Sequence, residues 1–525
     1  MWKAIENFNE TINDIVWIKV GIWLLLFSGI LFTILSRGFQ FTHLGHWMKK
    51  TIGSLFDSKV KGKDTKSKDD KASISQFQAL CTSLAATLGV GNIAGVAAAI
   101  TAGGPGAVFW MWMAAVFGMM TSFVENVLGI YFRRKNHAGE WSGGAMYYLR
   151  DGFGGYKHMK KVGKILAAIF ALCTILASFG IGNMGQVNKI VINITDAFKI
   201  KGLSDKVLYT SGDTDITLYM LILGIILMVF VAVVLLGGIQ RTASVAEKIA
   251  PFMIVSYVLG SLIIIIGNAG DVPESMKAIF SMAFTKKAAW GGAAGITFKT
   301  ILTTGCRRGM FSNEAGLGST VMVNASSNVV EPVKQGMWGM FEVFADTILV
   351  CTMTALTVLT SGVVDLKTGV AVTNNDATLV ADAFDTVFKF GDFRLGKYFI
   401  AISIMLFALS TIPGWAHYGV KAVEYLSGKK APTAVMVYKI IFICMIVLGA
   451  IITSSFAWSI SDTFNGMMMI PNMIGVLSLS PLVVKILKNY VDRRIRGNMD
   501  IRPMLSHVPE IEEEGIRRIE ETGEE

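Results

Sequence analysis

Long apolar stretches recur along this chain, separated by shorter polar and charged segments. The stretch LYMLILGIILMVFVAVVLLGG (218–238) has no charged residue and exceeds the roughly 20 residues that a helix needs to cross a bilayer. The pattern predicts eleven membrane-spanning helices, at residues 16–36, 75–100, 106–131, 163–195, 216–238, 244–267, 288–306, 336–361, 397–424, 433–454 and 457–487. It therefore predicts an all-α polytopic membrane protein in which one leading span precedes ten others.

The loops between these spans alternate in charge. The loop 37–73 carries nine lysine and arginine residues, and the loop 132–162 carries seven. Further basic residues on the same side are Arg241, Lys248, Arg307, Arg308, Lys429, Lys430, Lys485, Lys488, Arg493, Arg494 and Arg496. Because cytoplasmic loops carry the excess of Lys and Arg, the N-terminus is predicted to lie outside and the C-terminus inside.

Composition agrees with a protein of the cell membrane. The 525 residues are 53% hydrophobic and 16% charged, whereas soluble domains carry about 25% charged residues. The five cysteines lie in or beside apolar stretches at no metal-like spacing, which favours small apolar residues over a disulfide framework. The net charge of +10 comes from the basic loops and does not indicate nucleic-acid binding. No HExxH or GxSxG motif is present, so we predict that the protein is not an enzyme.

The span 75–100 is interrupted near its middle. Its segment SLAATLGVGNIAGV (83–96) places Gly89, Gly91 and Asn92 together. Glycine costs about 1 kcal/mol of helix propensity, and a freed backbone group in lipid costs several. The glycines either form a packing face for another helix or open the backbone to a ligand.

A second span, 288–306, contains Gly291, Gly292, Gly295 and Gly305. If the leading span is set aside, the two glycine-interrupted spans are the first and sixth of ten, so the second five enter the membrane with opposite polarity. The predicted divisions are a leading span (1–36), a charged cytoplasmic loop (37–74), a first five-helix repeat (75–267), a second five-helix repeat (268–487) and a cytoplasmic tail (488–525). Such paired interruptions in inverted repeats indicate a transporter site at mid-membrane.

The first interruption offers two kinds of polar group. The half-helix that starts near Asn92 directs its positive end, with the freed N–H groups of Gly89 to Gly91, toward the break, which suits a carboxylate. The preceding half-helix ends there with free carbonyls, which suit a cation or an ammonium group. One break therefore matches both charged groups of an amino acid.

Other spans carry polar residues at membrane depth. Asn183 and Gln186 are three residues apart, so they share a helical face that either contacts a ligand or bonds a neighbouring helix. Ser410 and Thr411 either bond back to carbonyls one turn earlier or, with the carbonyl of Phe407, form an oxygen site for sodium.

Several further residues are candidates for more than one role. Trp415 is either core or the wall of a small pocket. Asp346 is a candidate functional carboxylate or pairs with a neighbouring helix, and Glu125 lies near the inner basic loop. Lys299 either attracts acidic or amide groups or faces the cytoplasmic water path.

Three segments carry a resemblance to a known family. SLAATLGVGNIAGVAAAITAGGPGAVFWMW (83–112), GCRRGMFSNEAGLGS (305–319) and WSGGAMYYL (141–149) resemble the alanine or glycine:cation symporter family, which comprises the sodium:alanine symporters. The similarity runs from about Gln76 to the last predicted span. The family belongs to the amino acid–polyamine–organocation superfamily and has a LeuT-type fold of five plus five inverted spans, which agrees with the symmetry described above.

The resemblance implies sodium-coupled import of a small neutral amino acid, such as alanine, glycine or glutamine, by alternating access. It implies that a substrate contacts Gly89, Val90, Gly91, Asn92, Asn183, Gln186, Gly295, Thr297 and Trp415. It implies that Na⁺, the co-transported ion, contacts the carbonyls of Ala85 and Leu88 and the hydroxyls of Ser410 and Thr411, to which the residue pattern adds the carbonyl of Phe407.

Other functions stay open as alternatives. A proton-coupled transporter of the same fold would use Asp346 or Lys299 as the proton carrier. A channel and a membrane-embedded enzyme are less well matched, because neither a four-fold pore motif nor a catalytic motif is present. The expected partners are the amino acid and the lipid bilayer, with no nucleic acid and no obligate protein partner.

Overall fold

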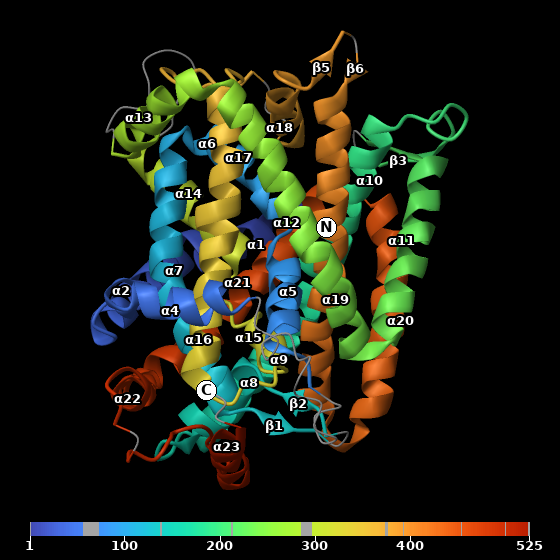
Figure 1. The fold of residues 1–525 in the computed structure, drawn as a ribbon. Coiled ribbons are helices and arrows are strands. Elements are labelled where there is room, and N and C mark those ends of the chain that lie inside the picture. The colour runs from blue at the N-terminus through green and yellow to red at the C-terminus, as the bar shows by residue number, and fades with distance from the viewer. Residues whose placement is uncertain are drawn as a thin grey trace.

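The computed structural model describes residues 2–55, 73–136, 139–211, 214–284, 297–372, 376–391, 393–452, 454–498 and 500–522. These residues form a bundle of long helices that run roughly parallel, with short strands and helices at the two ends (Figure 1). We call the end that carries β1, β2 and α23 the basic end, because the loop 132–162 lies there.

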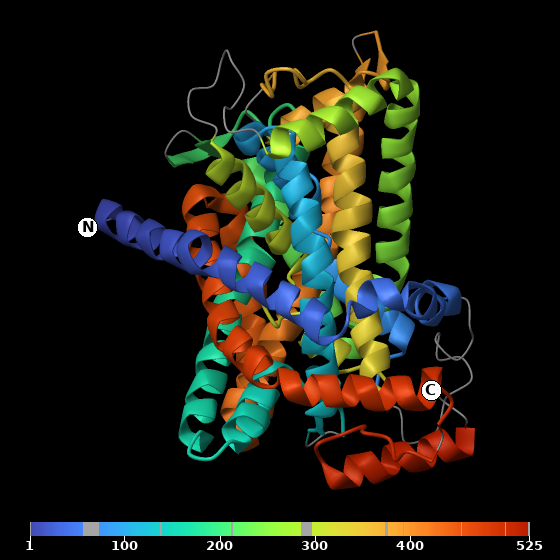
Figure 2. The same ribbon diagram turned by 90° about the vertical axis from the view of Figure 1, so that its left-hand side faces the viewer.

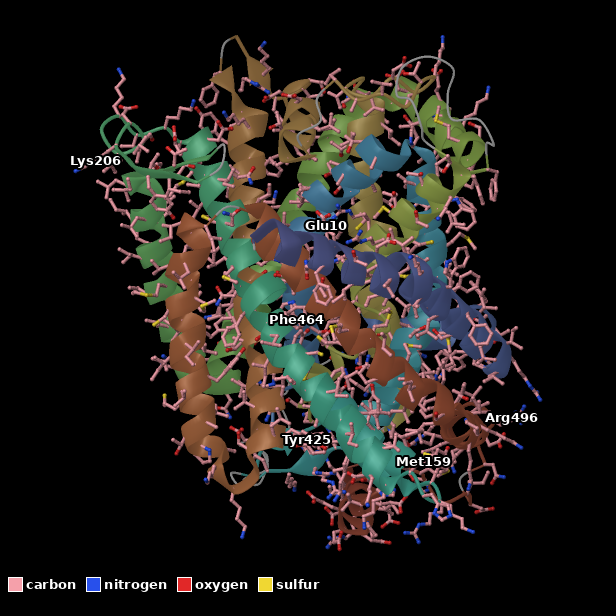
Figure 3. The ribbon with its side chains drawn as sticks, turned by 180° about the vertical axis from the view of Figure 1, so that it is seen from behind. Glu10, Met159, Lys206, Tyr425, Phe464 and Arg496 are labelled. Carbon is pink, nitrogen blue, oxygen red and sulfur yellow. The ribbon has the colours of Figure 1, made fainter. Side chains whose placement is uncertain are left out.

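The N-terminal segment does not run parallel to the long helices of the bundle. α1 (Trp2–Asn13) continues through a π-helical segment (Asp14–Gly21) into α2 (Ile22–Leu35), and α3 (Phe39–Thr42) and α4 (Leu44–Lys50) follow. Figure 2 shows this segment crossing the flank of the molecule obliquely, with the N-terminus projecting from it. α1 packs against α21 (Ser454–Ser478), as Figure 3 shows near the labelled Glu10 and Phe464.

The next part of the chain begins at a well-defined helix start. Ser75 accepts a hydrogen bond from the backbone N–H of Gln78 at 3.1 Å, and the Gln78 side chain accepts one from the Ser75 N–H at 3.2 Å, a reciprocal cap. The helices that follow are α5 (Gln76–Thr87), α6 (Ala94–Gly103), α7 (Gly106–Tyr131), α8 (Ala145–Tyr147), α9 (Lys160–Phe179), α10 (Gly185–Ala197), α11 (Leu218–Leu236) and α12 (Gly238–Gly267). α7 coincides with the predicted span 106–131.

The remaining helices are α13 (Val272–Ala283), α14 (Phe298–Asn313), α15 (Val321–Asn324), α16 (Pro332–Val343), α17 (Thr352–Thr360), α18 (Asp376–Asp385), α19 (Leu395–Ser427), α20 (Ala431–Ile451), α21, α22 (Ser480–Tyr490) and α23 (Pro509–Thr522). A π-helical segment, Phe344–Cys351, joins α16 to α17. Three antiparallel strand pairs connect helices: β1 (Arg134–Lys135) with β2 (Trp141–Ser142), β3 (Val207–Ser211) with β4 (Thr214–Thr217), and β5 (Lys389–Phe390) with β6 (Phe393–Arg394).

The helices are suited to a membrane. In the described part of the chain, seven helical stretches are long and apolar enough to cross a bilayer, or eight if α21 and α22 are one bent span. One of these stretches, Leu395–Ile451, contains both α19 and α20, which lie side by side (Figure 1). Large exposed apolar side chains typical of a lipid-facing surface occur on several helices, including Ile226, Val233, Phe252, Ile266, Met436 and Ile440.

The last predicted span contains a sharp bend. Residues 457–487 do not form one straight helix, because the chain bends by 58° between α21 and α22. Pro481, in the first turn of α22, has no N–H with which to continue the preceding helix. Figure 2 shows α22 lying across the basic end of the molecule.

The sixth of the ten core spans is also placed differently from the prediction 288–306. Residues 288–296 lie outside the described residues, and α14 then runs without interruption through Arg307 and Arg308 to Asn313. Arg307 lies inside the bundle and pairs with Asp462 of α21 at 2.9 Å. Arg307 is therefore not a residue of an exposed basic loop as predicted, because it is paired within the protein, and Arg308 lines a cavity beside the first break.

The chain is interrupted directly after α14, while the predicted interruption at Gly291, Gly292 and Gly295 lies outside the described residues. Glu314 adopts the left-handed conformation with φ of 56°, which is uncommon for a residue other than glycine, and Gly316 and Gly318 follow with φ of 89° and 73°. Helix resumes only at α15. The interruption thus falls in the segment NEAGLGS (313–319), beyond the end of the predicted span.

Candidate functional site

The predicted interruption of the span 75–100 is present. α5 ends at Thr87, residues Val90–Asn92 form a single 3₁₀ turn, and α6 begins at Ala94. The turn is held by the N–H of Asn92, which donates to the Gly89 carbonyl at 3.3 Å, and the N–H of Ile93, which donates to that of Val90 at 3.2 Å.

Asn92 connects the break to the second half of the chain. Its side chain is fully buried; its Oδ1 accepts from the Gly89 N–H at 3.0 Å, and its Nδ2 donates to Asp346 Oδ1 at 2.7 Å. The Gly89 N–H, which the sequence suggested for a carboxylate, is therefore already bonded. The backbone hydrogen bonds of the turn leave the N–H groups of Val90 and Gly91 as the donors at this position.

Five oxygens that the sequence proposed for sodium lie together between α5 and α19. Thr411 Oγ1 lies 3.1 Å from the Ala85 carbonyl oxygen, 3.4 Å from that of Leu88 and 2.9 Å from that of Phe407. Ser410 Oγ lies 3.3 Å from the Ala85 oxygen and 2.8 Å from the Phe407 oxygen. Both hydroxyls also bond back along their own helix, so the two interpretations of these residues are compatible.

Small residues allow α5 and α19 to approach this closely. A Cβ placed on Gly414 would lie 2.6 Å from the Cβ of Ala86, closer than two side chains can pack. The C-terminus of α5, which carries the negative end of the helix dipole, therefore points its carbonyls at the hydroxyls of α19.

The amides of the third core span separate rather than share a face. Gln186 lies beside the break, where a Cβ placed on Gly89 would be 3.5 Å from its amide atoms and 3.2 Å from Thr411 Oγ1. Asn183 donates instead to the Phe442 carbonyl of α20 at 2.7 Å. For Asn183 the predicted alternative of a bond to a neighbouring helix is therefore confirmed, and a π-helical turn, Gly180–Met184, alters the helical register ahead of Gln186.

Trp415 is buried and links α19 to the second break. Its Nε1 donates to Glu314 Oε1 at 3.1 Å, and Glu314 also accepts from Ser319 Oγ at 2.5 Å. A Cβ on Gly182 would collide with the Cβ of Trp415, so the base of this side chain rests on the third core span. Trp415 thus packs at the centre of the bundle.

The predicted contacts from 288–306 are not brought to the break. Gly295 lies outside the described residues, and Thr297 is exposed at the start of α14, where its Oγ1 accepts from the Thr300 N–H at 3.2 Å. Lys299, in the first turn of α14, is also exposed. Gly91 faces Phe311 and Ser312, near the other end of α14.

Three buried carboxylates, Glu342, Glu125 and Glu314, make contacts that the sequence did not predict. Glu342 accepts from Ser83 Oγ of α5 at 2.9 Å. Glu125 is fully buried and accepts from Asn472 Nδ2 at 2.5 Å, so it does not reach the basic loop. Within the described residues neither these two nor Glu314 or Asp346 forms an ion pair. The acid beside two glycines in NEAGLGS is the one sequence feature that marks this region.

A cavity of about 170 Å³ opens beside the first break. It is lined by Val90, Gly91, Ala94, Gly95, Lys189, Arg308, Phe311 and Asp462. The leading segment supports this wall: Arg307 donates to Asn13 Oδ1 at 2.9 Å, and Trp17 Nε1 donates to the Asp462 carbonyl at 2.9 Å. The cavity therefore combines freed backbone with side chains of both charges.

A helical membrane protein whose interrupted span exposes backbone to a cavity is of the secondary-transporter class. Residues 2–503 match the family described as "Sodium:alanine symporter family", and the chain belongs to that family. Its members are transporters rather than enzymes.

Curated relatives cover nearly the whole chain. "Sodium/alanine symporter AgcS" of Methanococcus maripaludis is 39% identical over 486 residues, which are 92% of this chain and 97% of that protein. "Probable sodium/glutamine symporter GlnT" of Bacillus subtilis is 34% identical over 500 residues, 95% of this chain and 93% of that protein. The solved structure of MhsT with L-phenylalanine shares 12% identity and a TM-score of 0.48 over 79% of this chain and 98% of that one, which is too distant to assign a fold.

Proposed function

We propose that this protein imports a small neutral amino acid together with Na⁺ by alternating access. The observation that carries the proposal is the convergence of five oxygens from α5 and α19 directly beside an interrupted helix. The proposal includes a LeuT-type arrangement of eleven spans, with the divisions 1–36, 37–74, 75–267, 268–487 and 488–525, an outside N-terminus and an inside C-terminus.

The oxygen cluster suits a monovalent cation. All five oxygens are neutral carbonyls or hydroxyls, and such unwound-backbone carbonyls at half-helix ends bind Na⁺ in transporters built from broken helices. We assign the ion to Ala85, Leu88, Phe407, Ser410 and Thr411.

The substrate carboxylate fits at the N–H groups of Val90 and Gly91, where the positive end of α6 also points. Gly91 leaves space there, and Gln186 Oε1, which has no hydrogen-bond partner among the described residues, can accept a hydrogen bond from the substrate ammonium group. A cavity of about 170 Å³ favours a small solute. The names of the relatives support alanine or glutamine, and the small cavity also admits glycine.

The two sites share one segment of backbone. Leu88 offers its carbonyl to the cation, and the next residue, Gly89, begins the turn that presents its N–H groups to the carboxylate. Binding of the cation fixes the position of α5 against α19 and hence the shape of the turn. Cation and amino acid should therefore raise one another's affinity by the same factor.

The test is uptake of labelled alanine into proteoliposomes with an inward sodium gradient. We expect accumulation that disappears when sodium is replaced by potassium. Equal uptake without sodium would refute sodium coupling.

A proton-coupled mechanism is the second candidate, because Asp346 is buried without an ion-pair partner in the described chain and bonds to Asn92 at the break. A relative in Bacillus subtilis, 32% identical, is named as a "sodium/proton-dependent" alanine carrier. Uptake driven by a pH gradient alone would favour this mechanism over sodium symport.

A further inference from the structure

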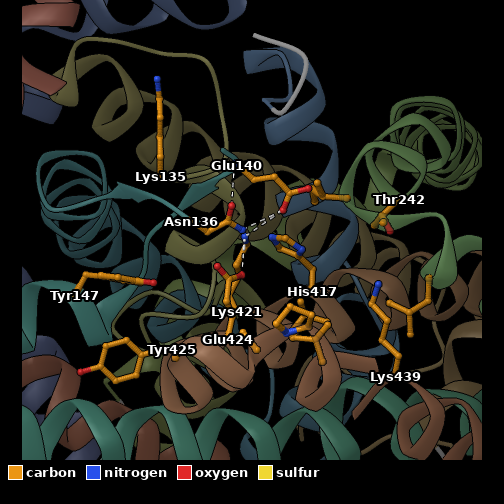
Figure 4. A pocket seen from close by; sticks show the side chains of 18 of the residues that line it. Lys135, Asn136, Glu140, Tyr147, Thr242, His417, Lys421, Glu424, Tyr425 and Lys439 are labelled. Carbon is orange, nitrogen blue, oxygen red and sulfur yellow. Dashed lines mark hydrogen bonds and ion pairs between the residues drawn. The ribbon is translucent and has the colours of Figure 1, made fainter. Parts of the chain in front are cut away.

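A second, larger cavity lies at the basic end of the molecule, apart from the proposed transport site (Figure 4). Its volume is about 510 Å³, within the range of small-molecule sites. Its walls come from the last turns of α19, the start of α20, the junction of α11 and α12, and the segment around β1 and β2.

One side of this cavity is cationic. The lining contains Lys135, Arg150, Lys421 and Lys439 but only two carboxylates, Glu140 and Glu424. The side chain of Lys421 is 2% exposed and lies 3.1 Å from Glu424 and 4.0 Å from Glu140, as Figure 4 shows. Within the described part of the chain, no carboxylate lies in ion-pair range of Lys439. Lys135 pairs with Glu514 and Arg150 with Asp151, so Lys439 is the lining cation left without a carboxylate partner among the described residues.

A buried histidine in the same wall has an unused ring nitrogen. His417 is 5% exposed, and its Nε2 has no hydrogen-bond partner among the described residues. A buried polar atom without a partner is costly, and an occupant with a hydroxyl or other polar hydrogen would remove that cost. This atom is a second, independent indication that the cavity receives a polar ligand.

The opposite side is apolar and continues into the lipid-facing surface. The apolar lining residues are Leu235, Ile239, Val420, Ala431, Pro432 and Val435. On α20, Met436 and Ile440 are each about half exposed and directly follow Val435 and Lys439. On α11, Val233 and Leu236 are likewise exposed beside Leu235. The cavity thus joins a cationic interior to a surface that faces hydrocarbon.

We infer that this cavity binds the headgroup of an anionic phospholipid, with the phosphodiester at Lys439 and Lys421 and a headgroup hydroxyl at His417 Nε2. The acyl chains lie along the exposed apolar faces of α11 and α20. Basic pockets between membrane helices on the cytoplasmic side take lipid headgroups in this way. A soluble phosphate would match the lysines but would leave the adjoining apolar surface unused, so the lipid is the better match.

The experiment is native mass spectrometry of the purified full-length protein in detergent, with equal amounts of phosphatidylglycerol and phosphatidylethanolamine added. We expect preferential retention of phosphatidylglycerol. Lys439→Gln should lower that retention about fivefold, because this is the change in binding that corresponds to the loss of one lysine near an anionic headgroup. Lys439→Arg should keep it, and Lys430→Gln, which removes an exposed lysine outside the cavity, should leave it unchanged.

A second measurement separates the lipid from a soluble anion. Glycerol 3-phosphate, which has the phosphate and hydroxyls but no acyl chains, should not displace phosphatidylglycerol from the wild-type protein. Displacement at equal concentration would overturn the lipid assignment in favour of a soluble-anion site. Equal retention of the two lipids, or equal losses in Lys439→Gln and Lys430→Gln, would overturn the site itself.

Discussion

Thr411 offers the sharpest test of the proposed sodium site. Its hydroxyl lies within 3.4 Å of three carbonyl oxygens from two helices, so it is the most connected of the five candidate ligands. Thr411→Ala removes this oxygen without adding volume. A hydrogen bond to a charged group is worth about 1.5–3 kcal/mol, so the affinity for Na⁺ should fall roughly tenfold to a hundredfold.

The assay is the initial rate of amino-acid uptake into proteoliposomes as a function of external sodium. The half-saturating sodium concentration should rise in Thr411→Ala and stay close to wild type in Thr411→Ser, which keeps the hydroxyl. Ser403→Ala is the matched control, because Ser403 is a buried hydroxyl of α19 outside the oxygen cluster. An unchanged sodium dependence in Thr411→Ala, or an equal shift in Ser403→Ala, would refute the assignment.

Three further substitutions test the surroundings of the break. Gly89→Leu should abolish uptake, because its Cβ alone would lie 3.2 Å from a proposed sodium ligand, whereas Gly45→Ala adds a methyl group to open space on α4, away from the cavity, and should be tolerated in the same uptake assay. Asp462→Asn should lower uptake more than Asp492→Asn, since Asp462 pairs at the wall of the cavity and Asp492 pairs with an exposed arginine. Asp346→Asn should weaken uptake but leave it sodium-dependent in a sodium titration.

A specific result would contradict each of these three predictions. Normal uptake by Gly89→Leu would place the substrate elsewhere, and equal effects of Asp462→Asn and Asp492→Asn would remove the cavity wall from the transport path. Proton-driven uptake that is lost in Asp346→Asn would favour the proton-coupled alternative.

The first interruption could be predicted from the sequence because two glycines and an asparagine at mid-span disfavour a continuous helix in lipid. On α19, hydroxyl residues beside Pro413 in an apolar helix also stand out, whereas the facing carbonyls of Ala85 and Leu88 were implied only by the family resemblance. The break and the hydroxyls depend on local composition, but the meeting of α5 with α19 does not.

The interruption after α14 was not predicted, for a physical reason. Counting glycines pointed to 288–306, of which 288–296 lie outside the described residues, and did not mark the position where Glu314 takes a left-handed conformation. That conformation is stabilised by hydrogen bonds from Ser319 and Trp415, the latter from α19, about 100 residues away in sequence. Arg307 was misread for a similar reason, because its partner Asp462 is distant in the chain.

The leading segment is more than an anchor for the helices that follow. Asn13 and Trp17 bond to Arg307 and to the Asp462 carbonyl, the pair that stands beside the cavity at the first break. A version of the protein reduced to its ten core helices would retain every proposed ligand of Na⁺. It would nevertheless lose part of the support of the cavity wall, so an engineered truncation or an N-terminal fusion that displaces α1 would change substrate handling rather than ion binding.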